Sequence, residues 1–499
     1  MAIGYSLLLP IVLPFAGVIV TLLVRKNRRW QAGLALGFML TALASSLALA
    51  QRVFVGREIL ALQSGAWPVP AGITLIADPL GVFMLVMTQL VLSAGILYAT
   101  GTIEKVVQYP TFYPVFLGLA TGMSGAFLSG DLFNLFVFAE LIVISGAVLT
   151  GMADDKYGVE ASYKYLIIST VGALLFLLGI GSLYTVHGTL NLAQLAQAIA
   201  ANPSHPLTMA GLAFLTATFL TKSAGFPFHF WQPDFHTAAP TPVHAVLSSV
   251  VVKVGVYGFL RLTIMLFPGF ELLKTLLVIV GVIGVIYGGL GAAGTYSVKR
   301  MLAYSTMSQL GFIMVGIGWG SPLALSGALI FAFNHALAKA AMLMMAGAMA
   351  SRTPDKNAAF SAVVGIGKNS PFAGLLFLLG GMALAGVPPL NGFVSKLMIF
   401  LGGIEAGQYL SLGIIGIASV ITLSYVIRSF MKIWFEQNPE VKPKNGDKLI
   451  APAILIALCL ALGIWSGPLV SASDYAVSVL LQPETYIAVI NTLPQVGLP

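Results

Sequence analysis

Long apolar stretches recur along the whole chain, and each has about the length of a helix that crosses a bilayer. Only 8% of the 499 residues are charged, whereas a soluble domain carries about 25%. A helical span needs about 20 apolar residues, and in lipid only helices or closed barrels pair every backbone polar group. The sequence therefore predicts an all-α polytopic membrane protein. The fourteen expected spans lie near 6–24, 32–50, 79–100, 112–129, 131–151, 163–186, 208–235, 243–265, 271–294, 301–318, 323–349, 371–401, 409–431 and 449–466.

The basic residues are distributed unevenly between the loops. If the 25–30 loop is cytoplasmic, 17 Lys and Arg residues, Lys442 and Lys444 among them, fall on the cytoplasmic side and 4 on the opposite side. This bias follows the positive-inside rule. We therefore expect a protein of the prokaryotic cell (inner) membrane with both termini outward. Because the basic residues are spread through short loops, no nucleic-acid partner is expected.

Several classes of site have no sequence signal. The single cysteine, Cys459, lies in an apolar stretch, which excludes a disulfide framework and a cysteine zinc site. Arg25, Lys26, Arg28 and Arg29 follow the first apolar stretch, which indicates an uncleaved helix and not a signal peptide. No Walker loop, dinucleotide fingerprint or haem-binding histidine pair is present. We expect no cofactor, and neither ATP binding nor electron transfer by this chain.

Five ionisable residues stand inside otherwise apolar stretches: Glu140, Lys222, Lys253, Lys339 and Lys396. A charge in the hydrocarbon core is costly and marks an ion pathway or proton relay. Structural pairs should come as matched acid and base, whereas here four lysines share one glutamate. Lys222 is the expected partner of Glu140, although a static salt bridge is an alternative. The set predicts a proton relay.

A histidine extends this set. His335 and Lys339 stand at positions i and i+4 and so share one helical face. With Lys253 from another helix they predict a central relay in which the histidine shuttles protons. A core histidine without such a role is the alternative. No Cys, Asp or second His stands at ligand spacing, so no metal site is expected.

His229, His236 and His244 cluster around the second half of the seventh span, with Asp234 among them. Their spacings of seven and eight residues are close to two helical turns. We interpret the cluster as a hydrated proton entrance or exit. A zinc site and ordinary loop or helix-end histidines are the alternatives.

Two aspartates stand at predicted helix starts. Asp78 precedes Pro79 and is expected to cap the third span. Asp131 begins the fifth span. It is either a second cap or part of an ion entrance.

A short motif recurs 161 residues apart, as Ala224-Gly225-Phe226-Pro227 and Ala385-Gly386-Val387-Pro388. Gly and Pro interrupt a helix, so spans 7 and 12 are predicted to be discontinuous. Paired interrupted spans are typical of transporters built from two repeated halves. Chance recurrence of a common membrane-helix motif is the alternative.

These residues, in this order, resemble the antiporter-like subunits shared by Mrp-type cation/proton antiporters, respiratory complex I and membrane-bound hydrogenases. The likeness covers nearly the whole chain and is strongest for the D type of Mrp antiporters, because the A type is much longer and the complex I L type carries a lateral helix. The complex I M type usually has Glu where this chain has Lys396. These points do not separate the D type from the complex I N type or from the hydrogenase relatives. The motifs are GDLFNLFVFAEL around Glu140, TKSAGFPFHFWQPDFHTAAPTPVHAVLSSVVVKVGVYGFLR from Lys222 through Lys253, KRMLAYSTMSQLGF at 299–312, FNHALAKA around His335 and Lys339, and AGVPPLNGFVSK ending at Lys396.

The resemblance implies two inverted five-helix repeats. It divides the chain into 1–110 with helices 1–3, 111–266 with helices 4–8, 267–435 with helices 9–13, and 436–499 with helix 14 and an outward-facing tail. Glu140 and Lys222 would form the first half-channel. Lys253, His335 and Lys339 would be the link, and Lys396 the far end. His236 and His244 are not expected from the family pattern, so their role stays open.

The expected function is a proton-translocating subunit of an Mrp-type Na⁺(cation)/H⁺ antiporter that works with other membrane subunits. Such a chain moves protons, with Na⁺ exchanged by the assembly, and is not an enzyme. The alternative is a proton-pumping membrane subunit of a redox complex, either an NADH or ferredoxin dehydrogenase or a hydrogenase, where it would be a translocase subunit. A third alternative is a scaffold whose charges only hold helices together.

Overall fold

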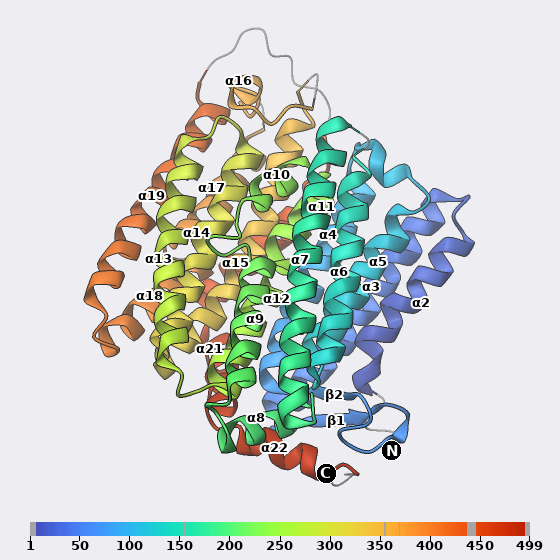
Figure 1. The fold of residues 1–499 in the computed structure, drawn as a ribbon. Helices are drawn as coiled ribbons and strands as arrows, with labels where there is room; N and C mark the ends of the chain where they lie inside the picture. Colours follow the sequence, from blue (N-terminus) through green and yellow to red (C-terminus); the bar gives the residue numbers. More distant parts are fainter. Residues whose placement is uncertain (1–5, 154, 354–355, 369, 437–445, 495–499) are drawn as a thin grey trace.

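The computed structural model describes residues 6–153, 155–353, 356–368, 370–436 and 446–494. Lys442 and Lys444, two of the basic residues predicted to be cytoplasmic, lie outside these ranges. Long helices run side by side through the molecule, and the predicted all-α membrane fold is confirmed (Figure 1). Within the described residues ten helices are long and apolar enough to cross a membrane, or up to eleven if one pair bent by 80° counts as a span.

Each of the fourteen predicted ranges overlaps a helix, but several of these helices are short. Helices α5, α9, α17, α18 and α20 have between 15 and 17 residues. The two helix breaks shorten α9, α17 and α18, and the 80° bend shortens α20. The number of fourteen spans, the inverted repeats and the four-part division therefore stay predictions. The helix bounds are α2 (Leu9–Leu23), α3 (Arg28–Ala50), α4 (Pro79–Gly101), α5 (Phe112–Phe127), α6 (Leu132–Gly151), α7 (Lys156–His187), α8 (Leu192–Ala201), α9 (Pro206–Lys222), α10 (Trp231–Ala238), α11 (Thr241–Val246), α12 (Lys253–Leu260), α13 (Glu271–Gly294), α14 (Val298–Trp319), α15 (Pro322–Ala350), α16 (Phe360–Val363), α17 (Pro371–Ala385), α18 (Asn391–Glu405), α19 (Tyr409–Trp434), α20 (Ile450–Ile464), α21 (Gly467–Leu481) and α22 (Glu484–Asn491).

Short irregular turns complete the elements. Turns η5 (Leu247–Val251) and η6 (Arg261–Leu266) are π-helical and join α11 and α12 into one apolar stretch. The remaining turns are η1 (Ser6–Leu8), η2 (Gln51–Val55), η3 (Ser64–Ala66) and η4 (Lys105–Gln108).

One small sheet was not predicted. Strands β1 (Leu60–Gln63) and β2 (Thr74–Ala77) pair antiparallel, with Leu60 opposite Ala77. Four residues a strand are too few for a sequence pattern to stand out. The sheet lies with α8, α22 and both chain ends at one end of the molecule, which we call the sheet end (Figure 1).

Both predicted helix breaks are present. Helix α9 ends at Lys222, Ala224 takes a left-handed conformation (φ 51°), and α10 begins at Trp231. Helix α17 ends at Ala385, and Gly386 takes φ 83° before α18 begins. A left-handed residue stops an α-helix, and the prolines that follow lack the N–H that would continue it.

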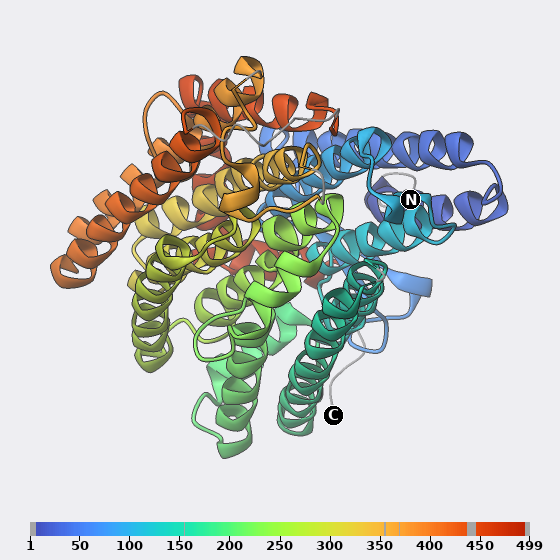
Figure 2. The same ribbon diagram turned by 90° about the horizontal axis from the view of Figure 1, so that it is seen from above.

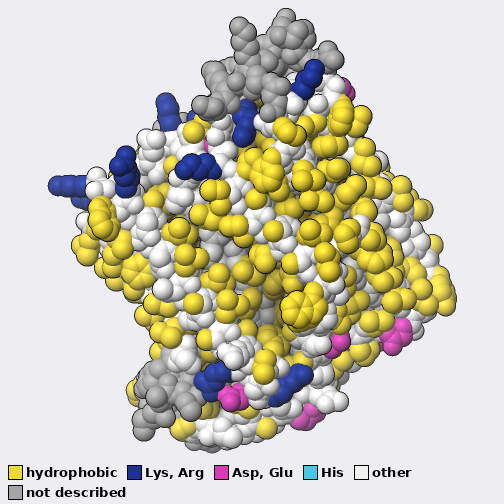
Figure 3. Space-filling model, turned by 180° about the vertical axis from the view of Figure 1, so that it is seen from behind, with side chains coloured by type: hydrophobic (Ala, Val, Ile, Leu, Met, Phe, Trp, Pro, Cys, Tyr) yellow, Lys and Arg dark blue, Asp and Glu magenta, His cyan; other side chains and the backbone are white. Residues whose placement is uncertain are grey.

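Helix α15 is the centre of the molecule. All of its most apolar 18-residue window is buried, and it packs against α4, α11, α14, α17, α18, α20 and α21. Helices α2 and α3 form one edge of the molecule and α19 forms the opposite edge (Figure 2). Apolar side chains cover a broad band of one face, with Lys and Arg side chains toward its upper and lower margins (Figure 3).

Candidate functional site

Glu140 and Lys222 meet beside the first helix break. Lys222 Nζ donates to Glu140 Oε1 at 2.9 Å, and the two side chains are 8% and 25% exposed. Lys222 is the last residue of α9, while Glu140 lies in the middle of α6. A cavity of about 10 Å³, lined by Lys222, Thr221 and Tyr165 among others, adjoins the pair. That is close to the smallest volume that holds one water.

Lys253 and His335 form the second contact. Lys253 Nζ lies 2.7 Å from His335 Nδ1, and both side chains are buried. The ring nitrogen Nδ1 can accept from the lysine in the tautomer that carries its proton on Nε2. His335 Nε2 has no partner within the described residues. One nitrogen of this imidazole therefore contacts a lysine, and the second is free to exchange a proton.

Lys339 points to a different helix. Its Nζ donates to Ser305 Oγ at 2.7 Å and to the Leu302 carbonyl at 3.1 Å, both on α14. Tyr425 Oη, on α19, also donates to Ser305 Oγ, at 2.8 Å. Sequence reasoning missed Ser305 and Tyr425. Ser305 stands inside the 299–312 motif and could have been noticed there, whereas nothing in the sequence marks Tyr425.

Lys396 lies beside the second helix break. Its Nζ donates to the Ala385 carbonyl, the last of α17, at 2.9 Å and lies 5.0 Å from the centre of the Phe312 ring. The break thus supplies a carbonyl for the lysine, and the aromatic face favours its positive charge. Lys253, Lys339 and Lys396 all lie within electrostatic range of His335. The structure therefore groups the four central residues around α15.

A reciprocal amide pair ties this group together. Asn334 Nδ2 donates to the Asn391 carbonyl at 2.8 Å, and Asn391 Nδ2 donates back to Asn334 Oδ1 at 3.0 Å. Asn334 adjoins His335, and Asn391 opens α18, the helix that carries Lys396. The position of the second break is thereby fixed to the histidine helix.

The five residues predicted around a proton entrance or exit do not lie together. Asp131 caps α6 by accepting from the Phe133 and Asn134 amides at 2.8 and 3.0 Å, near the sheet end, where it bridges to Asn191. Burial raises the pKa of its carboxyl to about 6, although these two amides act to lower it. Asp131 is therefore a helix cap, as one of its two interpretations held. Asp78 likewise caps α4, accepting from the Gly81 amide at 3.1 Å.

The other four lie around α10. His236 and His244 are fully buried, with nearly parallel rings (10°) whose centres are 5.8 Å apart. None of their ring nitrogens has a hydrogen-bond partner in the described chain. His229 stacks on Phe226 with ring centres 5.4 Å apart. Among the described residues no group of three or more His, Cys, Asp or Glu is placed to hold a metal ion.

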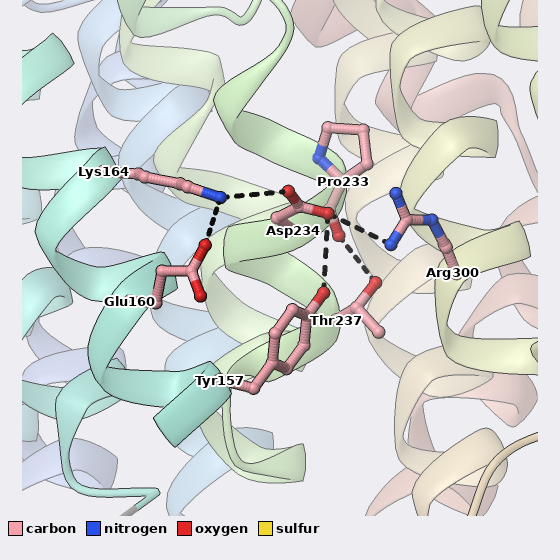
Figure 4. Close-up of polar contacts among 7 residues, drawn as sticks. All are labelled: Tyr157, Glu160, Lys164, Pro233, Asp234, Thr237 and Arg300. Carbon is pink, nitrogen blue, oxygen red and sulfur yellow. Dashed lines mark hydrogen bonds and ion pairs between the residues drawn. The ribbon is translucent and has the colours of Figure 1, made fainter. Parts of the chain in front are cut away.

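Asp234 joins α10 to two long helices (Figure 4). Arg300 Nη1, on α14, lies 3.0 Å from Asp234 Oδ1, and Tyr157 Oη, on α7, donates to the same oxygen at 3.5 Å. Lys164 Nζ, also on α7, lies 3.9 Å from Asp234 Oδ2 and 2.6 Å from Glu160 Oε1. Sequence spacing grouped Asp234 with the histidines and gave no sign of these cations.

One further buried charge was missed. From the sequence, Arg261 is expected among the four basic residues on the outward side, near the end of the 243–265 span, but the structure buries it to 3% exposure in the stretch Thr241–Leu266. Its Nη2 lies 2.6 Å from Asp78 Oδ1, and its Nε donates to Tyr257 Oη at 3.2 Å. Arg261 begins the π-helical turn η6, and its burial against Asp78 depends on helix packing that the sequence does not show.

Residues 129–422 match the family described as NADH:quinone oxidoreductase/Mrp antiporter, transmembrane. The chain belongs to this family. Its relatives include the D-type subunit of the Na(+)/H(+) antiporter of Alkalihalophilus pseudofirmus, 31% identical over 96% of this chain and 98% of the relative. The N-type subunit of the NADH-quinone oxidoreductase of Desulforudis audaxviator is 32% identical over 92% and 94%.

Two solved structures share the fold of this family member. A chain of the Mrp complex from Dietzia sp. DQ12-45-1b has a TM-score of 0.89 with 24% identity, covering 98% of this chain and 100% of that one. A chain of the membrane-bound sulfane sulfur reductase, an archaeal respiratory membrane complex, has the same TM-score and coverage with 28% identity.

Proposed function

We propose that this family member is an ion-translocating subunit of a multisubunit Mrp-type Na⁺/H⁺ antiporter, similar to the D type. The observation that carries the proposal is a set of buried amines with too few acids. Lys222 contacts Glu140, whereas Lys253, Lys339 and Lys396 each bond to neutral atoms. Two relatives named as D-type members of Na(+)/H(+) antiporters match over 96% of the chain.

The relay starts at the pair by the first break. Separation of Glu140 from Lys222 would leave an amine at 8% exposure without a counter-charge, which favours loss of its proton. The proton would pass through Lys253, His335 and Lys339 and reach Lys396 at the second break. One ring nitrogen of His335 can accept a proton while the other releases one, which suits a shuttle between amines.

The ends of the path are proposals too. His229, Asp234, His236 and His244 would line the access from the basic, cytoplasmic end, and Asp131 would lie at the outward sheet end. Both termini would face outward in the cell membrane, and the chain would work beside other membrane subunits. Protons would be its cargo. The chain is a transport component in this proposal and performs no reaction of its own.

Replacing Glu140 or Lys222 by Ala tests the relay. Each variant should abolish Na⁺/H⁺ antiport in everted vesicles while the assembly still forms, because the partner loses its counter-charge. Lys368→Ala is the matched control, since Lys368 is exposed and outside the spans. Full antiport by either the Glu140 or the Lys222 variant would contradict the proposal.

A second function has support of its own. The N-type relative and the sulfane sulfur reductase chain make a proton-pumping subunit of a redox complex the alternative. The subunits that purify with this chain distinguish the antiporter from the redox complex. Purification from native membranes with Fe–S or flavin subunits would favour the redox complex, whereas purification only with small membrane subunits would favour the antiporter.

A further inference from the structure

Helix α10 has buried polar atoms that nothing in the described chain satisfies. Both amide atoms of Gln232, the indole N–H of Trp231 and both ring nitrogens of His236 lack hydrogen-bond partners there. On α11 and η5, both nitrogens of His244 and the Ser249 hydroxyl also lack partners. These side chains are at most 4% exposed. Buried polar groups are normally paired with protein or with ordered water.

Water suits this place better than a cation does. Lys253 and Lys339 lie within electrostatic range of His236, as Lys299 and Lys339 do of His244. A metal or sodium ion would be repelled by these amines, and hard cations bind oxygen ligands, not imidazole pairs. Water can donate to one ring nitrogen and accept from another. The orphaned atoms therefore indicate water between α10 and α11.

One carboxylate on α10, that of Asp234, contacts both neighbouring long helices. Asp234 contacts Arg300 and Lys164 at 3.0 and 3.9 Å, so it joins α14 to α7 across the short helix (Figure 4). Phe235, the next residue, stacks on Tyr165 of α7 with ring centres 3.9 Å apart. Helix α10 has only eight residues and is preceded by the 223–230 break. Apart from these contacts, α10 is held by the packing of its buried side chains against α7 and α14.

Helix α11 is anchored separately. The Glu104 carboxylate accepts from the Thr241 amide at 3.0 Å, at the start of α11. An acidic group at a helix N-terminus is favourable. Loss of the Asp234 contacts would thus release α10 while α11, with His244, stays in place.

We propose that Asp234 is a clamp that holds α10 over a buried water site between His236 and His244, and that this clamp controls access to the relay from the basic end. The inference rests on the proposed function for its role in transport, but the clamp and the water are tested without transport. Asp234 acts through α10 and is a positioning residue.

The clamp is tested by hydrogen–deuterium exchange of the purified assembly, measured on peptides covering 229–240. Asp234→Asn should raise the exchange rate there about fivefold, the effect of losing a half-exposed ion pair. Arg300→Gln should raise the exchange rate by a similar factor. The double variant should exchange no faster than either single variant, because the two residues form one pair. Glu160→Gln is the matched control, since it contacts Lys164 but not α10, and should change nothing.

Equal exchange in Asp234→Asn and Glu160→Gln would overturn the clamp.

The water site is tested by hydroxyl-radical labelling of the native assembly. The buried His236 and His244 should be oxidised, as should the exposed Tyr296, which serves as the positive control for labelling. A lack of oxidation at both histidines would overturn the water site. Full antiport by Glu140→Ala would end the relay proposal and leave both of these readouts intact.

Discussion

Lys253, Lys339 and Lys396 each donate to a neutral acceptor, namely an imidazole nitrogen, a serine hydroxyl and a backbone carbonyl. An amine keeps donor hydrogens after it loses its proton, so these bonds can persist in both protonation states. Lys222 differs, because its neutral form would leave the Glu140 carboxylate without its counter-charge. At the residue scale the proposed relay therefore combines one ion pair with three sites whose protonation can change at low cost.

The Asp78–Arg261 pair contrasts with these sites, since both members are charged, contact each other at 2.6 Å and are 2% and 3% exposed. Replacing one member leaves the other buried and unpaired. Asp78→Asn should lower the free energy of unfolding by about 3 to 5 kcal/mol, measured by thermal unfolding of the purified protein. Glu58→Gln breaks the exposed Arg52–Glu58 pair and should cost about 1 kcal/mol or less. Equal losses would contradict this prediction.

At the scale of elements, each of the two broken helices places a lysine beside its break. Lys222 ends α9 at the first break, and Lys396 lies on α18 against the last carbonyl of α17. A break frees carbonyls that a continuous helix would use internally. The Ala385 carbonyl shows the benefit, because it becomes the acceptor for Lys396.

Gly386 makes the second break feasible. It has φ 83°, and a Cβ added there would lie 2.6 Å from Lys396 Cδ. Gly386→Ala should destabilise the protein by about 1 to 3 kcal/mol and reduce antiport by moving Lys396 from its carbonyl. Thermal unfolding and vesicle transport measure the two effects.

Gly413→Ala is the control for this substitution. Gly413 lies inside α19 with no atom within 4 Å of an added Cβ, so the alanine should be neutral or slightly stabilising. If both alanine variants behaved alike, the break would not depend on the left-handed glycine.

At the scale of the whole molecule, the proposed orientation can be tested with cysteines. The native Cys459 is fully buried and should give little background. Lys26→Cys and Lys368→Cys should react with an impermeant maleimide only in everted vesicles, and Ser204→Cys only in right-side-out vesicles. All three positions are exposed. Labelling of Ser204→Cys and Lys26→Cys from the same side would contradict the orientation.

Much of this architecture could be predicted from the sequence because the signals are local. Apolar stretches mark the helices, the repeated Ala-Gly-x-Pro marks both breaks, and one acid among four amines marks Lys222 as the partner of Glu140. Contacts between segments far apart in the sequence could not be predicted. The cations around Asp234, the serine that receives Lys339 and the burial of Arg261 all depend on how helices pack. The small β1–β2 sheet was missed since its strands are so short.

The buried position of α15 has a consequence for biogenesis. This helix carries His335 and Lys339, and it is enclosed by α4, α11 and α14, made before it, and by α17, α18, α20 and α21, made after it. When α15 emerges from the ribosome, the later helices that pack around these polar groups have not yet been synthesised. The insertion machinery must therefore shelter α15 until synthesis of the later helices closes around it, and chains truncated before α18 should be recognised and degraded as unfinished.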